Sequence, residues 1–236
     1  IKSIKNSKTD FFRKNDKMQE IMKSISKDKT VKKAIKQYEG LRIFKQAPFQ
    51  CMISFIISSN SNIQKIKNSL EKITKKFGEK VEIENKEFFL FPKPEKLANA
   101  SIEGIKRCGV GYRAPFIKQA AEMVLSEKIN FKHLEKCNYK EAKKNICLIP
   151  GVGNKVADCI LLFSLNKLEA FPLDTWMIKI LEKYYSNEFK IETKTITQKQ
   201  YEILHEKIVN YFGPYCGYAQ QFLFKMERES HNKKWL

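Results

Sequence analysis

The sequence has few of the features that mark fibrous, membrane or secreted proteins. Only nine glycines and seven prolines occur in 236 residues, and 42% of the residues are hydrophobic, which excludes collagen-like and wholly disordered chains. The longest uninterrupted apolar run is Cys159–Phe163, far shorter than the roughly 20 residues of a transmembrane helix. The N-terminal residues lack the apolar core of a secretory signal. We therefore expect an intracellular globular protein with no membrane partner.

Cysteines are present but not in the patterns that hold common cofactors. The six cysteines stand at positions 51, 108, 137, 147, 159 and 216. No two of them form a C-x-x-C pair, which argues against a zinc ribbon, and their spacing does not supply the four grouped ligands of an iron–sulfur cluster. We expect reduced thiols and no cofactor.

Acidic residues are scarce relative to basic ones. The chain has 45 Lys and Arg against 26 Asp and Glu, a formal net charge of +19. Such an excess favours a polyanionic partner, either nucleic acid or an anionic membrane face. A lysine-rich solvated surface is the alternative, and composition alone does not distinguish it from a binding surface.

Hydrophobic periodicity predicts an all-α fold. Residues 79–94 are expected to be irregular, and 40–44 to form a short strand or an extended segment. We divide the chain into an N-terminal basic helical segment, 1–44, and a core, 45–236; a first residue Ile1 in place of Met favours a fragment of a longer protein. Helices are predicted over 16–38 with a break near 27, and over 49–57, 63–77, 95–98, 101–107, 115–127, 139–148, 155–165, 175–185, 198–212 and 216–229.

The most informative segment is Pro150-Gly-Val-Gly-Asn-Lys, between two predicted helices. Gly151 and Gly153 on either side of Val152 allow a tight turn and a close approach of the backbone to a ligand. The N–H groups at the start of the next helix, together with its dipole, form a site for a phosphate. We interpret residues 147–165 as a helix-hairpin-helix that grips a DNA backbone without reading bases. A plain turn that needs glycine only for steric reasons is the alternative.

Lys155 lies in the first turn of the second hairpin helix, where it is either a phosphate contact or a nucleophilic amine. An ordinary lysine is almost wholly protonated at neutral pH, and a helix N-terminus, burial and cationic neighbours all favour loss of the proton.

Considered alone, Asp174 has the pattern of a helix N-cap. The helix from 155 is about 16 Å long and residues 166–173 span up to about 26 Å, so Asp174 can return to the lysine. A carboxylate there would stabilise a developing sugar cation.

With these residues the chain resembles the helix-hairpin-helix DNA glycosylase (HhH-GPD) superfamily, and within it the 8-oxoguanine DNA glycosylase/AP lyase branch. The resemblance covers roughly 40–229 and implies a two-lobed helical fold with an active-site cleft between the lobes. Five collinear motifs carry it: Ser-Ser-Asn-Ser-Asn-Ile (58–63), Gly-Val-Gly-Tyr-Arg-Ala (109–114), Pro-Gly-Val-Gly-Asn-Lys-Val-Ala-Asp-Cys (150–159), Pro-Leu-Asp (172–174) and Gly-Pro-Tyr-Cys-Gly-Tyr-Ala-Gln (213–220).

The resemblance implies base-excision repair of oxidised purines in double-stranded DNA. Lys155 would attack the sugar, displace the base and form a Schiff base, and β-elimination would then cut the strand. Asp174 would support the sugar cation and assist proton transfer. The damaged nucleotide must be flipped out, because neither group reaches a sugar carbon within a stacked duplex. We expect a DNA-associated monomer of the cytoplasm and nucleoid, or of the nucleus.

Further roles follow from the resemblance at single positions. Asn60, Tyr112 and Arg113 match residues that contact the orphaned cytosine or wedge into the stack; alone, they would read as turn and loop residues. Cys159 and Phe224 match the two walls that sandwich the flipped base, and without the resemblance both would be core residues. Gln220 matches the amide that reads the Watson–Crick edge of that base. Main-chain oxygens of Cys147, Ile149 and Val152 match the ligands of a monovalent or divalent cation at the hairpin.

The sequence also departs from the family pattern. Lys65 replaces an arginine, which removes a planar bidentate donor for the opposite cytosine. Trp176 replaces a phosphate-contacting histidine. Relatives carry an N-terminal β-rich domain, whereas only about 40 residues precede the matching region here.

Three other functions remain as alternatives. A monofunctional glycosylase would use activated water and generally lacks the hairpin lysine. A non-catalytic DNA-binding module would need the hairpin but neither Asp174 nor the base pocket. A peripheral membrane protein would need a basic amphipathic helix, for which 16–38 is the nearest match.

Overall fold

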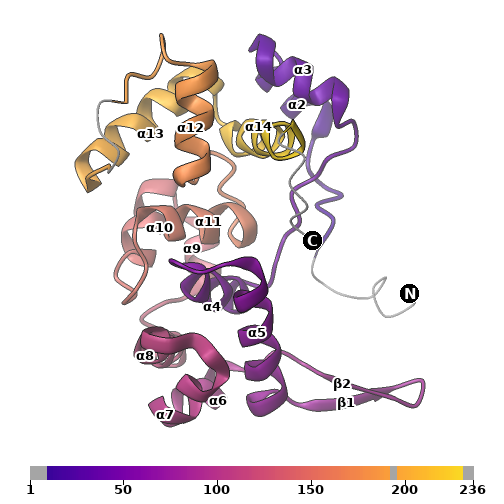
Figure 1. Ribbon diagram of the computed structural model, residues 1–236, viewed down its shortest axis with the longest axis vertical. Helices are drawn as coiled ribbons and strands as arrows, with labels where there is room; N and C mark the ends of the chain where they lie inside the picture. Colours follow the sequence, from indigo (N-terminus) through magenta and orange to yellow (C-terminus); the bar gives the residue numbers. More distant parts are fainter. Residues whose placement is uncertain (1–9, 192–195, 231–236) are drawn as a thin grey trace. The chain divides into compact units, whose positions relative to one another are not determined.

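The computed structural model describes residues 10–191 and 196–230. These residues are helical apart from loops and one two-stranded hairpin, so the all-α prediction is confirmed (Figure 1). The chain divides into two compact units, residues 46–160 and residues 1–45 with 161–236. Among the described residues, no helix combines the length and apolar character needed to cross a membrane.

The unit formed by residues 46–160 begins with the most apolar helix of the chain. Helix α4 has buried side chains on most of its faces, among them Cys51, Met52 and Ile56, as expected for a core helix. The unit contains α4 (Pro48–Ser58), α5 (Ile63–Phe77), β1 (Lys80–Ile83), β2 (Lys86–Phe89), α6 (Pro94–Ala98), α7 (Ile102–Ile105), the π-helical turn η1 (Lys106–Val110), the 3-10 turn η2 (Gly111–Arg113), α8 (Ala114–Leu125), α9 (Phe131–Lys136), α10 (Tyr139–Ile146) and α11 (Asn154–Ser164) as far as Ile160.

Residues 79–94 differ from the irregular segment that the sequence predicts. Strands β1 and β2 pair antiparallel, from Lys80 opposite Phe89 to Ile83 opposite Lys86, and the hairpin projects from the end of α5 (Figure 1). Glu84 and Asn85 form its turn with φ of 51° and 60°. A two-residue turn with positive φ at both positions is of type I′, which usually has Asn-Gly, so a Glu-Asn turn gives little signal in the sequence.

The second unit is built around α14 (Cys216–Ser230), whose side chains are buried on almost every face from Cys216 to Phe222. Four other helices pack against it: α2 (Met18–Ile25), α3 (Lys29–Gln37), α12 (Thr175–Tyr184) and α13 (Gln198–Phe212). Residues 41–47 belong to no helix or strand, so the short strand considered for 40–44 is absent.

The N-terminal segment therefore packs with the C-terminal helices. One cut between the units, after Lys45, falls next to the expected boundary at 44/45, and the other falls inside α11. The functional division into 1–44 and 45–236 stays a prediction, and residues 1–9 of its first part lie outside the described residues.

Asp28 connects α3 to the helices that follow it much later in the chain. Its carboxylate caps α3 by accepting a hydrogen bond from the Val31 N–H at 2.7 Å. It also accepts hydrogen bonds from the hydroxyls of Tyr185 at 2.7 Å and Tyr211 at 3.0 Å. Burial and this contact raise the pKa of Tyr211 to about 12, and raise the pKa of Tyr185 further.

We expect Asp28→Ala to destabilise the protein by about 2–4 kcal/mol, because it removes both a helix cap and a charged hydrogen-bond acceptor. Asn caps a helix about as well as Asp, so Asp28→Asn should cost less than Asp28→Ala. Chemical denaturation measures both variants. Equal stability of Asp28→Ala and wild type would contradict the role of this carboxylate.

Candidate active site

The predicted hairpin is present between α10 and α11, within residues 46–160. Its loop is closed by backbone hydrogen bonds, from the Leu148 N–H to the Asn145 carbonyl at 3.1 Å and from the Val152 N–H to the Ile149 carbonyl at 3.0 Å. The Gly153 carbonyl accepts the Ala157 N–H at 2.9 Å, the first bond of α11. The N–H groups just before Ala157 are those that a helix leaves without an intrahelical acceptor. Their position agrees with the expected anion site, and phosphate binding there stays a prediction.

The two hairpin glycines have different structural requirements. Gly151 has a φ of +81°, and a Cβ atom there would lie 2.6 Å from a ring carbon of Phe116 in α8. A Cβ atom on Gly153 would meet nothing within 4 Å. The first glycine is therefore needed for packing, whereas the second leaves open space beside the backbone.

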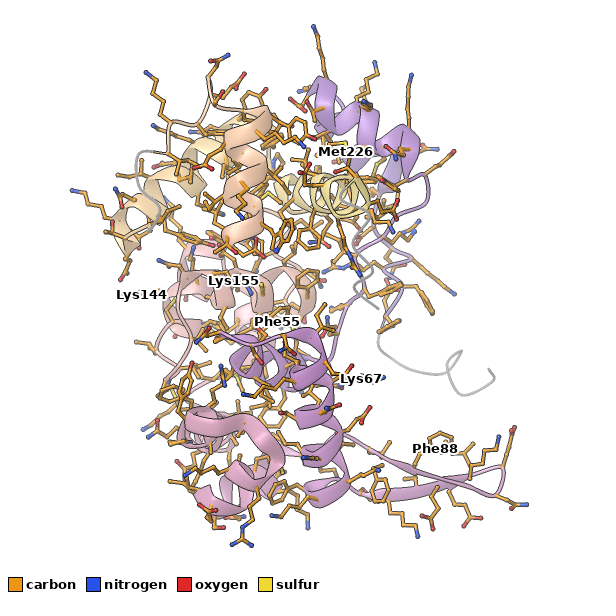
Figure 2. All side chains as sticks on the ribbon, viewed as in Figure 1. Phe55, Lys67, Phe88, Lys144, Lys155 and Met226 are labelled. Atoms are coloured by element: carbon orange, nitrogen blue, oxygen red, sulfur yellow. The ribbon has the colours of Figure 1, made fainter. Side chains whose placement is uncertain are left out.

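Lys155 is the second residue of α11 and is partly exposed. Its Nζ lies 5.5 Å from the ring centroid of Phe55 on α4, and Figure 2 labels both side chains. This distance is typical of a cation–π contact. The ring therefore restrains the amine, a role for Phe55 that periodicity did not reveal because an apolar residue in a core helix reads as packing.

A buried ion pair holds α10 against α11. Asp158 is fully buried and accepts hydrogen bonds from the Tyr139 hydroxyl at 2.6 Å and from Lys143 Nζ at 3.2 Å. Lys143 Nζ also donates to the Tyr139 hydroxyl at 2.9 Å. Asp158 stands one turn after Lys155, so the network fixes the helix that presents the lysine. The sequence gives no sign of this network beyond an Asp among the apolar residues of a helix.

The residues expected to contact the strand opposite the lesion lie in the same unit. Asn60 is exposed with a φ of 48°, and Tyr112 is 58% exposed. Lys65 is exposed on α5. Arg113 is only 4% exposed, and its guanidinium stacks 4.4 Å from the Tyr112 ring centroid.

The guanidinium of Arg113 donates hydrogen bonds to main-chain carbonyl oxygens. Its Nε donates to the Ser59 carbonyl at 2.9 Å, and its Nη2 donates to the Asn60 carbonyl at 3.0 Å and also to Ser59. These bonds hold the backbone of the Asn60 turn. Direct contact between Arg113 and a cytosine, as the resemblance implies, stays a prediction.

A chain of contacts links the Asn60 turn to the hairpin. The Tyr112 ring packs edge-to-face on Phe116 with centroids 6.3 Å apart, and Phe116 lies directly against Gly151. The structure therefore brings the expected wedge residue and the expected phosphate site together in one unit.

Cys159 is buried, 3% exposed, one turn after Lys155 on α11. The remaining pocket residues belong to the other unit. Gln220 is 4% exposed on α14, where its side-chain oxygen accepts a hydrogen bond from the Gln221 amide. Phe224 is half-buried one turn further on, so the two side chains share one helix face.

Asp174 is the N-cap of α12, and its carboxylate accepts the Met177 N–H at 2.8 Å. The interpretation of this residue as a cap is therefore confirmed. Lys155 and Asp174 stand in different units, and their pairing in one catalytic site stays a prediction.

One of the hairpin oxygens expected to bind a cation already takes part in a hydrogen bond. The Ile149 carbonyl already accepts one hydrogen bond, from Val152, but a carbonyl oxygen has two lone pairs. Oxygen ligands of this kind favour hard cations over transition metals. The cation stays a prediction.

Two helices that frame a Gly-x-Gly turn define a helix-hairpin-helix protein, and Lys155 stands at the start of the second helix. Residues 53–206 match the family model of HhH-GPD superfamily base excision DNA repair proteins. The chain belongs to this superfamily, which confirms the resemblance and the expectation of base-excision repair.

Two curated relatives cover most of the chain. A probable N-glycosylase/DNA lyase of Methanothermobacter thermautotrophicus is 30% identical over 86% of this chain and 68% of its own length. The N-glycosylase/DNA lyase OGG1 of Arabidopsis thaliana is 31% identical over 96% of this chain and 63% of its own length. The chain thus spans about two thirds of these relatives.

A solved structure is also similar. The 8-oxoguanine glycosylase/lyase of Clostridium acetobutylicum, in complex with double-stranded DNA containing cytosine opposite 8-oxoguanine, matches with a TM-score of 0.84 and 33% identity, over 98% of this chain and 76% of that one. At this identity the match supports relationship as well as fold.

Proposed function

We propose that this chain is a bifunctional DNA glycosylase that removes 8-oxoguanine from double-stranded DNA and then cleaves the abasic strand. One observation carries the proposal: Lys155 stands in the first turn of the second hairpin helix, beside a site for backbone phosphate. The N-glycosylase/DNA lyase names of the relatives and the 8-oxoguanine complex of the similar structure support both activities.

The lyase reaction needs an amine that first displaces the base and then forms an imine with the sugar. The Lys155 nitrogen forms a bond to C1′ of the sugar while the bond to the base breaks, and the base leaves with the electron pair and takes up a proton. Loss of the amine proton and opening of the sugar ring give an imine. Removal of a proton from C2′ then expels the 3′ phosphate and cuts the strand. A carboxylate such as that of Asp174 stabilises the positive charge that develops on the sugar.

Features of residues 46–160 favour DNA binding whether or not the protein catalyses base removal. Its hairpin loop, Tyr112 and the Asn60 turn are linked through Phe116, and the chain carries a net charge of +19. We propose that the protein acts as a monomer on DNA within the cell, with the hairpin on the lesion strand and the Asn60 turn on the opposite strand.

The test is single-turnover cleavage of a labelled duplex carrying 8-oxoguanine opposite cytosine, with guanine in place of the lesion as the control. We expect strand cleavage without alkali for the lesion and none for guanine. Cleavage that appears only after alkali would mean a monofunctional glycosylase. Binding without base release would mean a DNA-binding module, and either result overturns the proposal.

A further inference from the structure

Three side chains with metal-binding atoms lie together at the junction of α9 and α10. His133 is in α9, Cys137 directly follows that helix, and Glu141 is in the first turn of α10. Their ligand atoms all lie within 4.8 Å of one another. We propose that this cluster binds a transition-metal ion of the zinc type, with water completing the coordination.

The distances are close to those that a tetrahedral ion requires. Zinc binds nitrogen and oxygen at about 2.0–2.2 Å and sulfur at about 2.3 Å, which places neighbouring ligand atoms roughly 3.3–3.7 Å apart around a tetrahedral ion. His133 Nε2 and Glu141 Oε1 are already 3.5 Å apart. Since all three ligand atoms lie within 4.8 Å of one another, an ion requires the thiol to approach the other two by no more than about 1 Å relative to that geometry.

The backbone that carries the three ligands is held by local hydrogen bonds. The Asn130 side chain caps α9 by accepting the His133 N–H at 3.1 Å, and the Cys137 N–H donates to the His133 carbonyl at 3.0 Å. The Asn138 side chain caps α10 by accepting the Glu141 N–H at 2.9 Å. These bonds order the backbone on both sides of the cluster before any metal arrives.

The donor types select the class of metal. A thiolate with an imidazole and a carboxylate suits zinc, whereas magnesium and calcium prefer oxygen ligands alone. The Cys137 thiol donates to the Leu134 carbonyl at 3.4 Å, and binding would replace this proton with the ion. Glu141 and His133 are exposed, so the ion can enter from solvent.

The site is separate from the candidate active site but joined to it through one helix. Glu141 is on α10, the first helix of the hairpin, and the same helix carries the Lys143 that pairs with buried Asp158. A bound ion would therefore fasten the start of α10 to α9. The proposal does not depend on the glycosylase reaction.

The test is a cobalt(II) titration of the metal-free full chain. We expect a thiolate-to-cobalt charge-transfer band that saturates near one equivalent and is displaced by zinc. Cys137→Ser should abolish the band, and Glu141→Gln should weaken binding at least tenfold. Glu95→Gln, which changes an exposed acid in the first turn of α6, should leave it unchanged.

A second measurement guards against misfolded variants. Circular dichroism should show wild-type helix content for Cys137→Ser without metal, and zinc should raise the melting temperature of wild type but not of this variant. No band in wild type, or a band that persists in Cys137→Ser because another cysteine holds the ion, would refute the site.

Discussion

Replacing Lys155 by glutamine is expected to abolish the covalent complex that borohydride traps between wild-type enzyme and a duplex carrying 8-oxoguanine. Only a primary amine forms the imine that borohydride reduces, and glutamine keeps most of the length of the side chain without that amine. The amount of trapped complex, measured by denaturing electrophoresis, should fall to the level of a reaction without borohydride. Strand cleavage should fall with it.

The matched control is Lys144→Gln. Lys144 is exposed on the first hairpin helix, α10, and is labelled with Lys155 in Figure 2, so both variants remove one charge near the hairpin. Lys144→Gln should trap as much complex as wild type at saturating enzyme. Equal trapping by Lys155→Gln would show that another amine is the nucleophile and would remove the basis of the lyase assignment.

Asp174→Asn is expected to slow base release by about a hundredfold or more, the usual effect of removing one electrostatic contact to a charged transition state. Asparagine caps helices about as well as aspartate, so the hydrogen bond to the Met177 N–H survives and the folded state is retained. Single-turnover base release and DNA affinity are the two measurements, and affinity should change little.

Comparison with Asp174→Ala separates the two roles of this carboxylate. The alanine variant loses the cap as well as the charge, so it should be less stable by about 1 kcal/mol while showing a similar catalytic defect. If Asp174→Asn releases base at the wild-type rate, the carboxylate is only a helix cap and the proposed stabilisation of the sugar cation is wrong.

Features set by neighbouring residues were predictable from the sequence. The apolar stretch of α4, the hairpin glycines and the capping position of Asp174 depend on interactions over a few residues, which periodicity and residue type record. The short helices near 95–98 and 101–107 were predicted, but another short helix was missed. Helix α9 spans only Phe131–Lys136, too few residues for a repeating pattern.

Contacts between distant residues were not predictable. The pair of Lys143 with Asp158, the cation–π contact of Lys155 with Phe55 and the engagement of Arg113 by Ser59 all join separate helices or loops. In the sequence, Phe55 has the pattern of a core residue and Arg113 that of an exposed one. The cluster of His133, Cys137 and Glu141 has no C-x-x-C pattern in the sequence, because only one of the three residues is a cysteine.

The two hairpin glycines have different surroundings, and therefore different reasons for being glycine: Gly151 is needed for folding, and Gly153 for binding under the proposed function. Any side chain at position 151 collides with the Phe116 ring, so that position is constrained even in a protein that never meets a substrate. A methyl group at position 153 has room in the free protein, but under the proposed function it would stand where the hairpin backbone approaches a DNA phosphate. Evolutionary loss of DNA repair in a descendant of this chain would therefore free Gly153 to vary while Gly151 stayed fixed.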